Sequence, residues 1–568
     1  MDLQEKSLNL KKLVSKYDSA WLLGHLSELI RNISSGKAAE PISKLTSPMR
    51  QLHYLCGLNI SSKKVTNGDT HIDDKEWIQI VDLLCEIEFD YLKIFFPESI
   101  EEITDEWKRV RDVSMPSFLA YFNEGTLNYE EQTQNWITDL YSKVDIIINK
   151  ELGLSTNDLL EFHNNLYLYT QNNIQAILPH GEKQSKPDWE LHSRVKITPS
   201  DNMPEEMMDT FKAMKFMAIY FQDYGIIKRF YPKDIISENL NEEKVNLILS
   251  ILASERKEST FIYYTSENPL YKQPIFCIEN GSYQLLDSNT LINAIDKVLE
   301  KACSGNEKHK SQLIDKKGKL LEKRIINLLK KFFKKDYEYY SNYYVNGYEQ
   351  DILFLWKKYA FIIEAKGYNM REPFRDPNRA FTKIKDDFNS SIGKGYKQTK
   401  RIEEYFIEKK KLVITDKNNN ITKEIDTSKY ELDFSIIVNL KSFGQVQNDL
   451  NTLLDIGDDD TFPWVVKLDD LEVFLLTLLA KKFKPKKFID FLLMRENLHG
   501  KLICSDELEV CGGFLKDKIT FNKSLNNKTV ITLPDLTDIF DEQYHKGMGL
   551  ENERFFNEKK DDSSTFFM

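Results

Sequence analysis

The stretch that decides the fold is GYEQDILFLWKKYAFIIEAKGYN, residues 347–369. It contains two short apolar runs, 352–356 and 360–363, which are separated by the polar residues 357–359. Two apolar runs of this length on either side of a short polar turn predict a β-hairpin.

Three charged residues stand at the ends of the two predicted strands. Asp351 opens the first strand, and Glu364 and Lys366 end the second. Side chains two residues apart on a strand point to the same face. An antiparallel return brings the start of the first strand beside the end of the second. We therefore expect Asp351, Glu364 and Lys366 to converge on one small volume.

This set of residues suits the hydrolysis of a phosphodiester. Mg²⁺ (or Mn²⁺) prefers oxygen ligands, and Asp351, Glu364 and the backbone carbonyl of Ala365 supply them. Such a cation activates water and neutralises charge on the phosphate, while Lys366 would stabilise the transition state. Because two neighbouring carboxylates repel each other, we expect either a bound cation or a raised carboxyl pKa there.

Asp351, the hairpin and Glu364-Ala365-Lys366 together resemble the D…(D/E)xK signature of the PD-(D/E)xK, or restriction-endonuclease-like, nuclease superfamily. The resemblance covers roughly residues 310–445. It implies a central α/β core, in which a mixed sheet is flanked by helices, and a nuclease activity that is directed mostly at DNA.

Two flanking residues extend the resemblance. Glu322 lies on the helix expected before the hairpin, where members of this superfamily often carry a glutamate that joins the metal site. Gln398, in the helix expected to open near 393–401, resembles the glutamine of Mrr-like and related branches. Glu349 fits the spacing of those branches only in part, since Tyr348 separates it from Gly347. The resemblance thus implies Asp351, Glu364, Lys366, Glu322 and Gln398 as catalytic residues, and Asp351, Glu364, Glu322 and the Ala365 carbonyl as metal ligands.

Each of these residues also fits a purely structural role. Glu364 and Lys366 suit an exposed ion pair, Asp351 suits a turn, and Glu322 suits a solvated helix position among lysines. Gln398 suits a polar position on a helix surface, and Glu349 suits a residue that takes no part in the site. Other Glu-x-Lys triplets occur at 242–244 and 408–410. Neither of them ends an apolar strand, and neither is preceded by a strand that begins with an acidic residue. We therefore favour the nuclease interpretation.

The chain has 568 residues and a net charge of −11, which argues against coating nucleic acid through overall charge. Its basic residues nevertheless gather at 316–335 and 371–401, on both sides of the motif, and such clusters contact phosphates. The alternative is a solvated helix face. The segment 370–388 is expected to be a loop over the substrate. The predicted nucleic-acid-binding residues are Lys319, Lys323, Arg375, Arg379, Lys394, Lys397, Lys400 and Arg401.

The patterning predicts a multidomain α+β protein with four parts. Residues 1–185 form a helical sensor or interaction domain, and 186–305 a small α+β module. Residues 306–447 form the nuclease domain, and 448–568 a helical extension. In the small module, strands are expected at 261–264, 274–278 and 283–286, followed by a helix over 288–301.

Several classes of protein are disfavoured. The most apolar run, 471–480, is about half as long as the ~20 residues that a membrane-spanning helix needs. The first residues, MDLQEKSLNLKK, lack the apolar core of a signal peptide. The six cysteines form no CxxC, and the nine histidines form no HxH or HExxH. We therefore expect a cytoplasmic protein with no disulfide scaffold, no zinc site and no membrane association.

The sequence thus predicts a Mg²⁺-dependent DNA nuclease, with RNA a less favoured substrate, that acts in bacterial defence against phage or foreign DNA. The helical flanks are expected to bind a protein partner or a second copy of the chain. A non-catalytic nucleic-acid-binding or assembly protein with a nuclease-like core is the alternative. A nuclease that is silent until a partner or signal arrives is a third interpretation.

Overall fold

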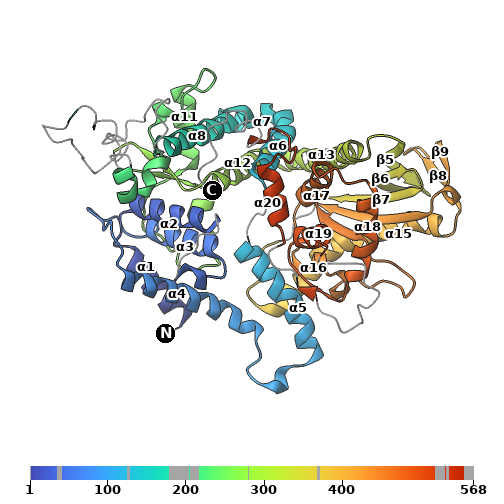
Figure 1. Cartoon of the computed structure of the whole chain (residues 1–568), viewed down its shortest axis with the longest axis horizontal. Coiled ribbons are helices and arrows are strands. Elements are labelled where there is room, and N and C mark those ends of the chain that lie inside the picture. Colours follow the sequence, from blue (N-terminus) through green and yellow to red (C-terminus); the bar gives the residue numbers. More distant parts are fainter. Residues whose placement is uncertain are drawn as a thin grey trace. The chain divides into compact units, whose positions relative to one another are not determined.

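The fold is that of a computed structural model of the chain, drawn in Figure 1. The structure describes residues 2–34, 41–124, 128–177, 204, 207, 217–278, 280–367, 371–517, 531–532 and 536–554. This part of the chain divides into two compact units, of which the first comprises 1–93 with 136–306 and the second 94–135 with 307–567. The chain is mixed α+β, as predicted. Within the described ranges, no helix is long and apolar enough to cross a membrane.

The first unit is largely helical over the N-terminal region, which confirms that part of the prediction. Side-chain caps begin several of its helices: Asp2 accepts the amide of Glu5, and Asp73 accepts that of Glu76. The α-helices of this unit are α1 (Leu3–Val14), α2 (Ser19–Ser34), α3 (Pro48–Ile60), α4 (Asp74–Leu92), α7 (Asp145–Leu152), α8 (Thr156–Ile177), α11 (Glu242–Leu252) and α12 (Ser288–Cys303), while α6 (Glu130–Tyr141) lies across the division between the units.

A small sheet of order β1-β4-β3-β2 belongs to the first unit. The predicted hairpin is present as antiparallel β3 and β4, and the predicted helix follows as α12. Its strands are β1 (Arg229–Phe230), β2 (Ala253–Ser254), β3 (Ile275–Cys277) and β4 (Tyr283–Leu285).

The strand predicted at 261–264 is wrong, because this segment is irregular. Side chains, not a neighbouring strand, satisfy two of its carbonyl groups. Nζ of Lys11 donates to the carbonyl of Phe261 at 3.0 Å, and the hydroxyl of Tyr54 donates to that of Ile262. The apolar pattern alone does not reveal such partners.

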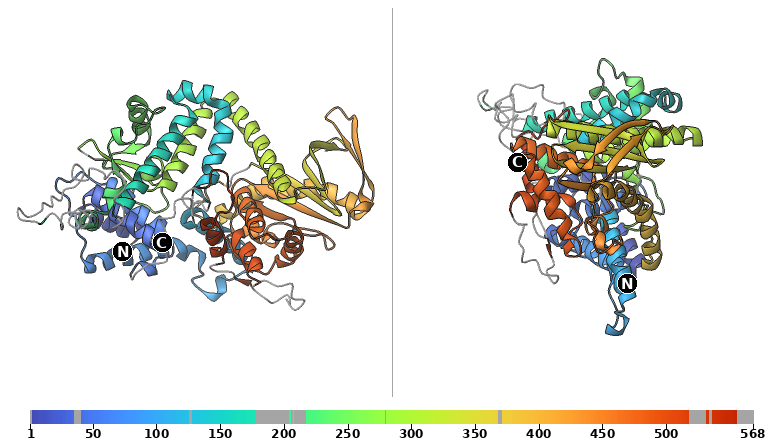
Figure 2. Two further views of the ribbon diagram at one scale, coloured as in Figure 1. Left: turned by 45° about the horizontal axis from the view of Figure 1, so that its top comes forward. Right: turned by 90° about the vertical axis from the view of Figure 1, so that its right-hand side faces the viewer.

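The second unit is built on a seven-stranded mixed sheet of order β11-β10-β7-β6-β5-β8-β9. Figure 2 shows these strands, coloured olive to orange, side by side. Strands β5, β6 and β7 form an antiparallel meander, and β10 and β11 extend it in parallel from β7. The strands are β5 (Tyr337–Val345), β6 (Tyr348–Trp356), β7 (Tyr359–Lys366), β8 (Lys411–Thr415), β9 (Ile421–Asp426), β10 (Leu432–Asn439) and β11 (Trp464–Lys467).

Two helices cover opposite faces of the β6–β7 hairpin. Phe333 of α13 (Glu307–Phe333) packs its ring on Phe354 and Phe361. Ile402 and Phe406 of α15 (Lys394–Ile407) share a buried cluster with Leu353, Leu355 and Ile362. Because neighbouring strand residues point to opposite faces, α13 and α15 sandwich the hairpin, as the resemblance implies.

The segment 370–388 was expected to be a loop. Residues 371–376 are irregular, as predicted, but the prediction is wrong for Pro377–Phe388, which form helix α14, and residue 370 lies outside the described residues. Asp376 caps the helix by accepting the amide of Arg379, and Pro377 suits the first turn. The apolar face of α14 is buried with Val113 of α5 (Asp105–Leu119). The sequence-remote helix α5 thus provides the surface that α14 needs.

Beyond β10 the second unit is mostly helical, as predicted, but β11 returns to the central sheet. This strand pairs in parallel with β10 from Ile436↔Trp464 to Asn439↔Lys467. The remaining elements are α16 (Gln445–Asn448), α17 (Leu468–Ala480), α18 (Lys486–Arg495), β12 (Leu502–Ile503), α19 (Glu507–Leu515), β13 (Ile531–Thr532) and α20 (Asp538–His545).

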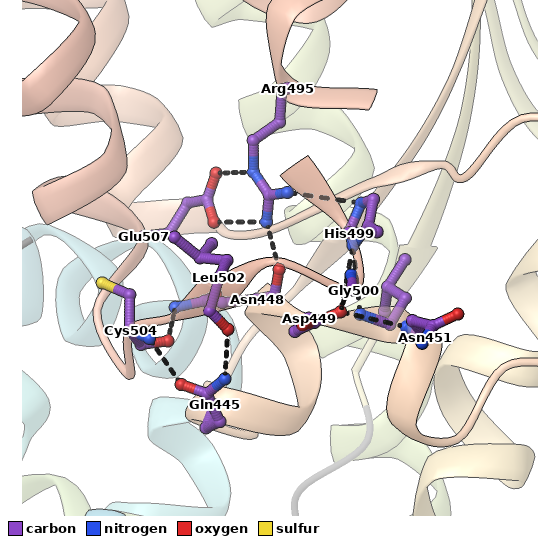
Figure 3. A network of polar contacts seen from close by, with 11 residues as sticks. Gln445, Asn448, Asp449, Asn451, Arg495, His499, Gly500, Leu502, Cys504 and Glu507 are labelled. Atoms are coloured by element: carbon purple, nitrogen blue, oxygen red, sulfur yellow. Dashed lines mark hydrogen bonds and ion pairs between the residues drawn. The ribbon is translucent and has the colours of Figure 1, made fainter. Parts of the chain in front are cut away.

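A buried polar network joins these C-terminal elements (Figure 3). The guanidinium of Arg495 binds both carboxylate oxygens of Glu507, at 2.8 and 2.9 Å, and donates to the carbonyl of Asn448 at 2.7 Å. Trp464 of β11 donates its indole N–H to Glu507 at 2.7 Å. Since Arg495 and Glu507 are almost completely buried, this network fixes α18 and α19 against the edge of the sheet.

Candidate active site

The β6–β7 ladder ends where the candidate residues begin. Its last pair is Ile352↔Ile363, so that Asp351 and Glu364 stand opposite each other just beyond the pairing. Their side chains replace the missing ladder bonds. Oδ2 of Asp351 accepts the amide N–H of Ala365 at 2.8 Å, and Oε1 of Glu364 accepts that of Asp351 at 3.3 Å. The two carboxylates therefore lie together where the strands separate.

Lys366 completes the group from the same strand. Its Nζ donates to Oε2 of Glu364 at 2.7 Å and lies 3.6 Å from Oδ2 of Asp351. It also donates to Oε1 of Gln398 on α15 at 2.9 Å. The structure thus brings together Asp351, Glu364, Lys366 and Gln398, four of the residues singled out from the sequence.

Burial alters the protonation of Glu364. The residue is 1% exposed. Its burial and the negative charge of Asp351 raise its pKa to about 8, against the opposing effect of Lys366. A carboxyl group with so high a pKa matches the expectation that two neighbouring acids in this place favour either a proton or a cation.

Glu322 of α13 lies in the same electrostatic neighbourhood. Its Oε2 accepts a 2.8 Å hydrogen bond from Nδ2 of Asn342 on β5. Burial raises its pKa to about 7, and the charges of Asp351 and Glu349 act in the same direction. Glu349 is exposed, and it influences the pKa of Glu322 through its charge.

Few side chains in this region could serve as ligands of a metal ion. Within the described ranges, no group of three or more His, Cys, Asp or Glu side chains is arranged to hold a metal ion. Glu322 therefore does not join Asp351 and Glu364 as a third clustered carboxylate. Mg²⁺ is usually bound through one or two carboxylates and keeps several waters. Asp351, Glu364 and the Ala365 carbonyl accordingly fit that ion by donor type.

Three further residues shape the site and were not identified from the sequence. Asn342 has a positive φ of 50°, at the one position where the β5–β6 pairing lapses opposite Asp351. Tyr343 is buried, and its hydroxyl has no hydrogen-bond partner within the described ranges. Burial and the charges of Glu364 and Asp351 raise the pKa of Tyr343 well above its usual value.

Gly395 is the third of these residues. A Cβ atom at this position would lie 3.2 Å from Cε of Lys366 and 3.1 Å from Cδ1 of Ile437. Glycine inside a helix costs stability relative to alanine, so its place within α15 is a signal that could have pointed to a close approach. The absent side chain lets α15 approach the end of β7 and brings Gln398 within reach of Lys366.

The predicted basic residues of α15 differ in their exposure and pairing. Lys394 and Lys397 are exposed next to Gln398. Lys400 binds Asp460 and is half-buried, while Arg401 lies 4.0 Å from the ring centre of Tyr348. Of the predicted cations on this helix, Lys394 and Lys397 are therefore the two whose side chains are exposed.

The other predicted cations lie on α13 and around the start of α14. Lys319 pairs with Asp315 at 2.8 Å on the surface of α13, whereas Lys323 is exposed. Arg375 pairs with Glu372 at 2.7 Å, and Arg379 is exposed on α14.

Residues 317–424 match the family model of the nuclease-related domain (NERD). This match contains Glu322, Asp351, Glu364, Lys366 and Gln398, and it agrees with the nuclease-like interpretation of the region at the level of a nuclease-related domain. Neither the curated proteins nor the solved structures gave a match to the chain.

Proposed function

We propose that the chain is a metal-dependent nuclease that hydrolyses phosphodiester bonds of DNA, with its active site at Asp351, Glu364 and Lys366. The observation that carries this proposal is the contact of Lys366 Nζ with Glu364 and Gln398, at 2.7 and 2.9 Å, inside the segment that matches the nuclease-related domain. DNA is proposed because the resemblance to the PD-(D/E)xK superfamily implies it.

The residues of the site have separable roles in this proposal. Asp351, Glu364 and the Ala365 carbonyl would hold Mg²⁺ or Mn²⁺, which when bound supplies an activated water and neutralises phosphate charge. Lys366 presents an ammonium group where negative charge develops on the scissile phosphate. Gln398 positions that ammonium, and Glu322 stands nearby as a carboxyl group able to hold or release a proton near neutral pH.

The test is cleavage of plasmid, linear and single-stranded DNA, and of RNA, with Mg²⁺, Mn²⁺ or EDTA. We expect wild-type protein to cut DNA only when a divalent cation is present. Asp351→Asn and Lys366→Ala should both abolish cutting while the far-ultraviolet circular dichroism spectrum stays unchanged. DNA cutting by both variants at the wild-type rate would refute the assignment of the site.

We further propose that the nuclease acts in bacterial defence against phage or foreign DNA. The residues assigned to the candidate site all belong to the second unit, which leaves the first unit for recognition, assembly or control. Plating of phage on cells that express wild-type protein or Glu364→Ala tests this role. Protection that is equal in both strains would contradict it.

A second candidate function is non-catalytic binding of nucleic acid. It is favoured by the ion pair between Lys366 and Glu364, and by the lack of a three-residue metal group in the described ranges. Titration with Mn²⁺ distinguishes the two functions. A nuclease binds the cation through Asp351 and Glu364, and the Asp351→Asn, Glu364→Gln double variant loses that binding.

A further inference from the structure

An open hollow of about 440 Å³ lies beside the first turns of α14, and its lining includes none of the residues proposed for catalysis. It is lined by Phe374, Asn378, Arg379, Thr382 and Lys383. One aromatic ring, two cations and two neutral polar side chains thus surround a single space.

The aromatic wall of the hollow is Phe374. The residue is 44% exposed, and within the described ranges its ring stacks on no other aromatic side chain. Covering an exposed apolar ring with a flat or apolar group is favourable, because it removes that surface from water. The ring is therefore available to a ligand.

The chain around Phe374 is held firmly. The backbone amide and the guanidinium of Arg371 bind the buried carboxylate of Asp387, at 3.1 and 2.8 Å. Arg375 lies 5.3 Å from the ring centre of Phe122 and pairs with Glu372. Of these two pairs, the one between Arg371 and the buried Asp387 ties the segment that carries the ring to α14, whereas the exposed pair of Arg375 and Glu372 contributes little.

The cations of the hollow behave differently from these neighbours. Arg379 and Lys383 stand one helical turn apart, at the i,i+4 spacing that places side chains side by side. In the part of the chain that the structure describes, neither side chain has an acidic partner within 4.0 Å, although Arg371 and Arg375 both do. Two neighbouring uncompensated cations favour a ligand with repeated negative charge.

Helix α14 is a rigid support for this surface. Its opposite face packs on α5, where Ser114 donates to the carbonyl of Pro377 at 2.7 Å and Arg109 lies 5.6 Å from the ring centre of Phe381. Its C-terminal end continues through Asn389–Gly393 into α15, which carries Gln398. Phe374 follows Lys366 by eight residues, so chain length limits their separation to roughly 28 Å.

We propose that this hollow binds a single-stranded segment of the DNA substrate, with one base stacked on Phe374 and the backbone phosphates on Arg379 and Lys383. The inference rests on the proposed nuclease function and names the form of DNA that the nuclease engages. In a duplex the faces of the bases are covered by their neighbours, whereas unpaired bases stack on exposed aromatic rings. Phosphates along the same strand supply the repeated negative charge.

The first test is binding of labelled oligothymidylate to the full chain carrying Glu364→Gln, in EDTA, so that no cleavage interferes. Phe374→Ala should weaken binding about 5- to 150-fold, since stacking contributes about 1–3 kcal/mol per base. Phe374→Trp should preserve it. The matched control Phe89→Ala, which removes a 63% exposed ring from α4, should leave binding unchanged.

The second test concerns the cations. Arg379→Gln with Lys383→Gln should lower the slope of log affinity against log salt by about 0.7 for each phosphate that no longer has a cation beside it. Lys417→Gln, on the exposed turn between β8 and β9, should leave the slope unchanged.

Two results would overturn the inference. One is binding by Phe374→Ala that equals wild type. The other is equal binding of an abasic strand and oligothymidylate, which is the result expected of a site that binds negative charge alone, such as that of an acidic peptide. If the binding effects are found but the wild-type protein does not cut DNA in Mg²⁺ or Mn²⁺, the proposed nuclease function would be refuted and the binding site would stand.

Discussion

Nζ of Lys366, at the end of β7, donates a 2.9 Å hydrogen bond to Oε1 of Gln398 on α15. This bond joins the last residue of the motif to α15, the second α-helix after it along the chain. Gln398 thereby orients the ammonium group toward Glu364, whose Oε2 accepts a second bond at 2.7 Å.

Replacement of Gln398 by alanine leaves Lys366 with Glu364 as its main acceptor. Because a hydrogen bond to a charged group contributes about 1.5–3 kcal/mol, we expect DNA cleavage to slow by about 10- to 150-fold. The measurement is the initial rate of plasmid cleavage in Mg²⁺. Gln312→Ala, on an exposed position of α13, is the control and should cleave at the wild-type rate. A wild-type rate for Gln398→Ala would remove Gln398 from the site.

Replacement of Gly395 by alanine tests the close approach of α15 to β7. The new methyl group would crowd Lys366 Cε and Ile437, so we expect slower cleavage in a folded protein. The matched change Gly318→Ala, where no atom lies within 4 Å of the new Cβ, should stabilise α13 by about 0.5–1 kcal/mol and spare activity. If both substitutions leave cleavage unchanged, the packing of α15 does not position Lys366.

The metal-free protein should lose stability as the pH rises. The pKa of Glu364 is raised to about 8 from a usual value of 4.5, so the folded state keeps a proton that the unfolded chain has released between these values. The unfolded state is therefore favoured progressively over this range. In EDTA, we expect the free energy of unfolding, measured with urea, to fall between about pH 5 and 8.

Glu364→Gln removes this titration and should make the fall of stability with pH shallower, while Glu322, whose pKa is raised to about 7, still contributes to it. The matched variant Glu408→Gln changes an exposed glutamate and should retain the wild-type dependence. A Glu364→Gln profile as steep as that of wild type would show that another group titrates.

The buried pair Arg495–Glu507 should be important for the stability of the second unit. Arg495→Ala leaves the carboxylate of Glu507 buried without its partner, which we expect to cost about 3–5 kcal/mol in unfolding free energy. Lys486→Ala breaks an ion pair of 2.8 Å whose lysine is 72% exposed, and should cost under about 1 kcal/mol. If Arg495→Ala and Lys486→Ala lower the free energy of unfolding in denaturant equally, burial does not determine how much an ion pair contributes to stability.

The sequence was informative where local patterns decide the structure. The runs on either side of Lys357-Lys358 form the predicted hairpin, because their residues alternate between two buried faces. The same argument placed Glu364 and Lys366 on one face of β7. The antiparallel return likewise predicted that Asp351 lies beside them. No residue pattern, by contrast, announces that the β6–β7 ladder stops at Ile352↔Ile363, where the two carboxylates accept the amide N–H groups of Asp351 and Ala365.

Long-range packing explains what the sequence did not reveal. Strand β11 is a four-residue parallel strand that leads directly into α17, so its apolar pattern merges with that of the helix. Val113 of α5 was grouped with the N-terminal helices, yet it is buried in the same cluster as Ile384 and Phe388 of α14. Partners so remote along the chain leave no local signal.

The sharpest test of the proposed active site compares two glutamates that both occur as Glu-x-Lys. Glu364→Gln changes the buried residue of the candidate site, and Glu408→Gln changes the exposed residue of a similar triplet. Supercoiled plasmid DNA is incubated in Mg²⁺ with each variant and with wild type. We predict that Glu364→Gln slows cleavage by about 100-fold or more, while Glu408→Gln cuts as wild type does. Cleavage by Glu364→Gln at the wild-type rate would show that Glu364 does not belong to the active site.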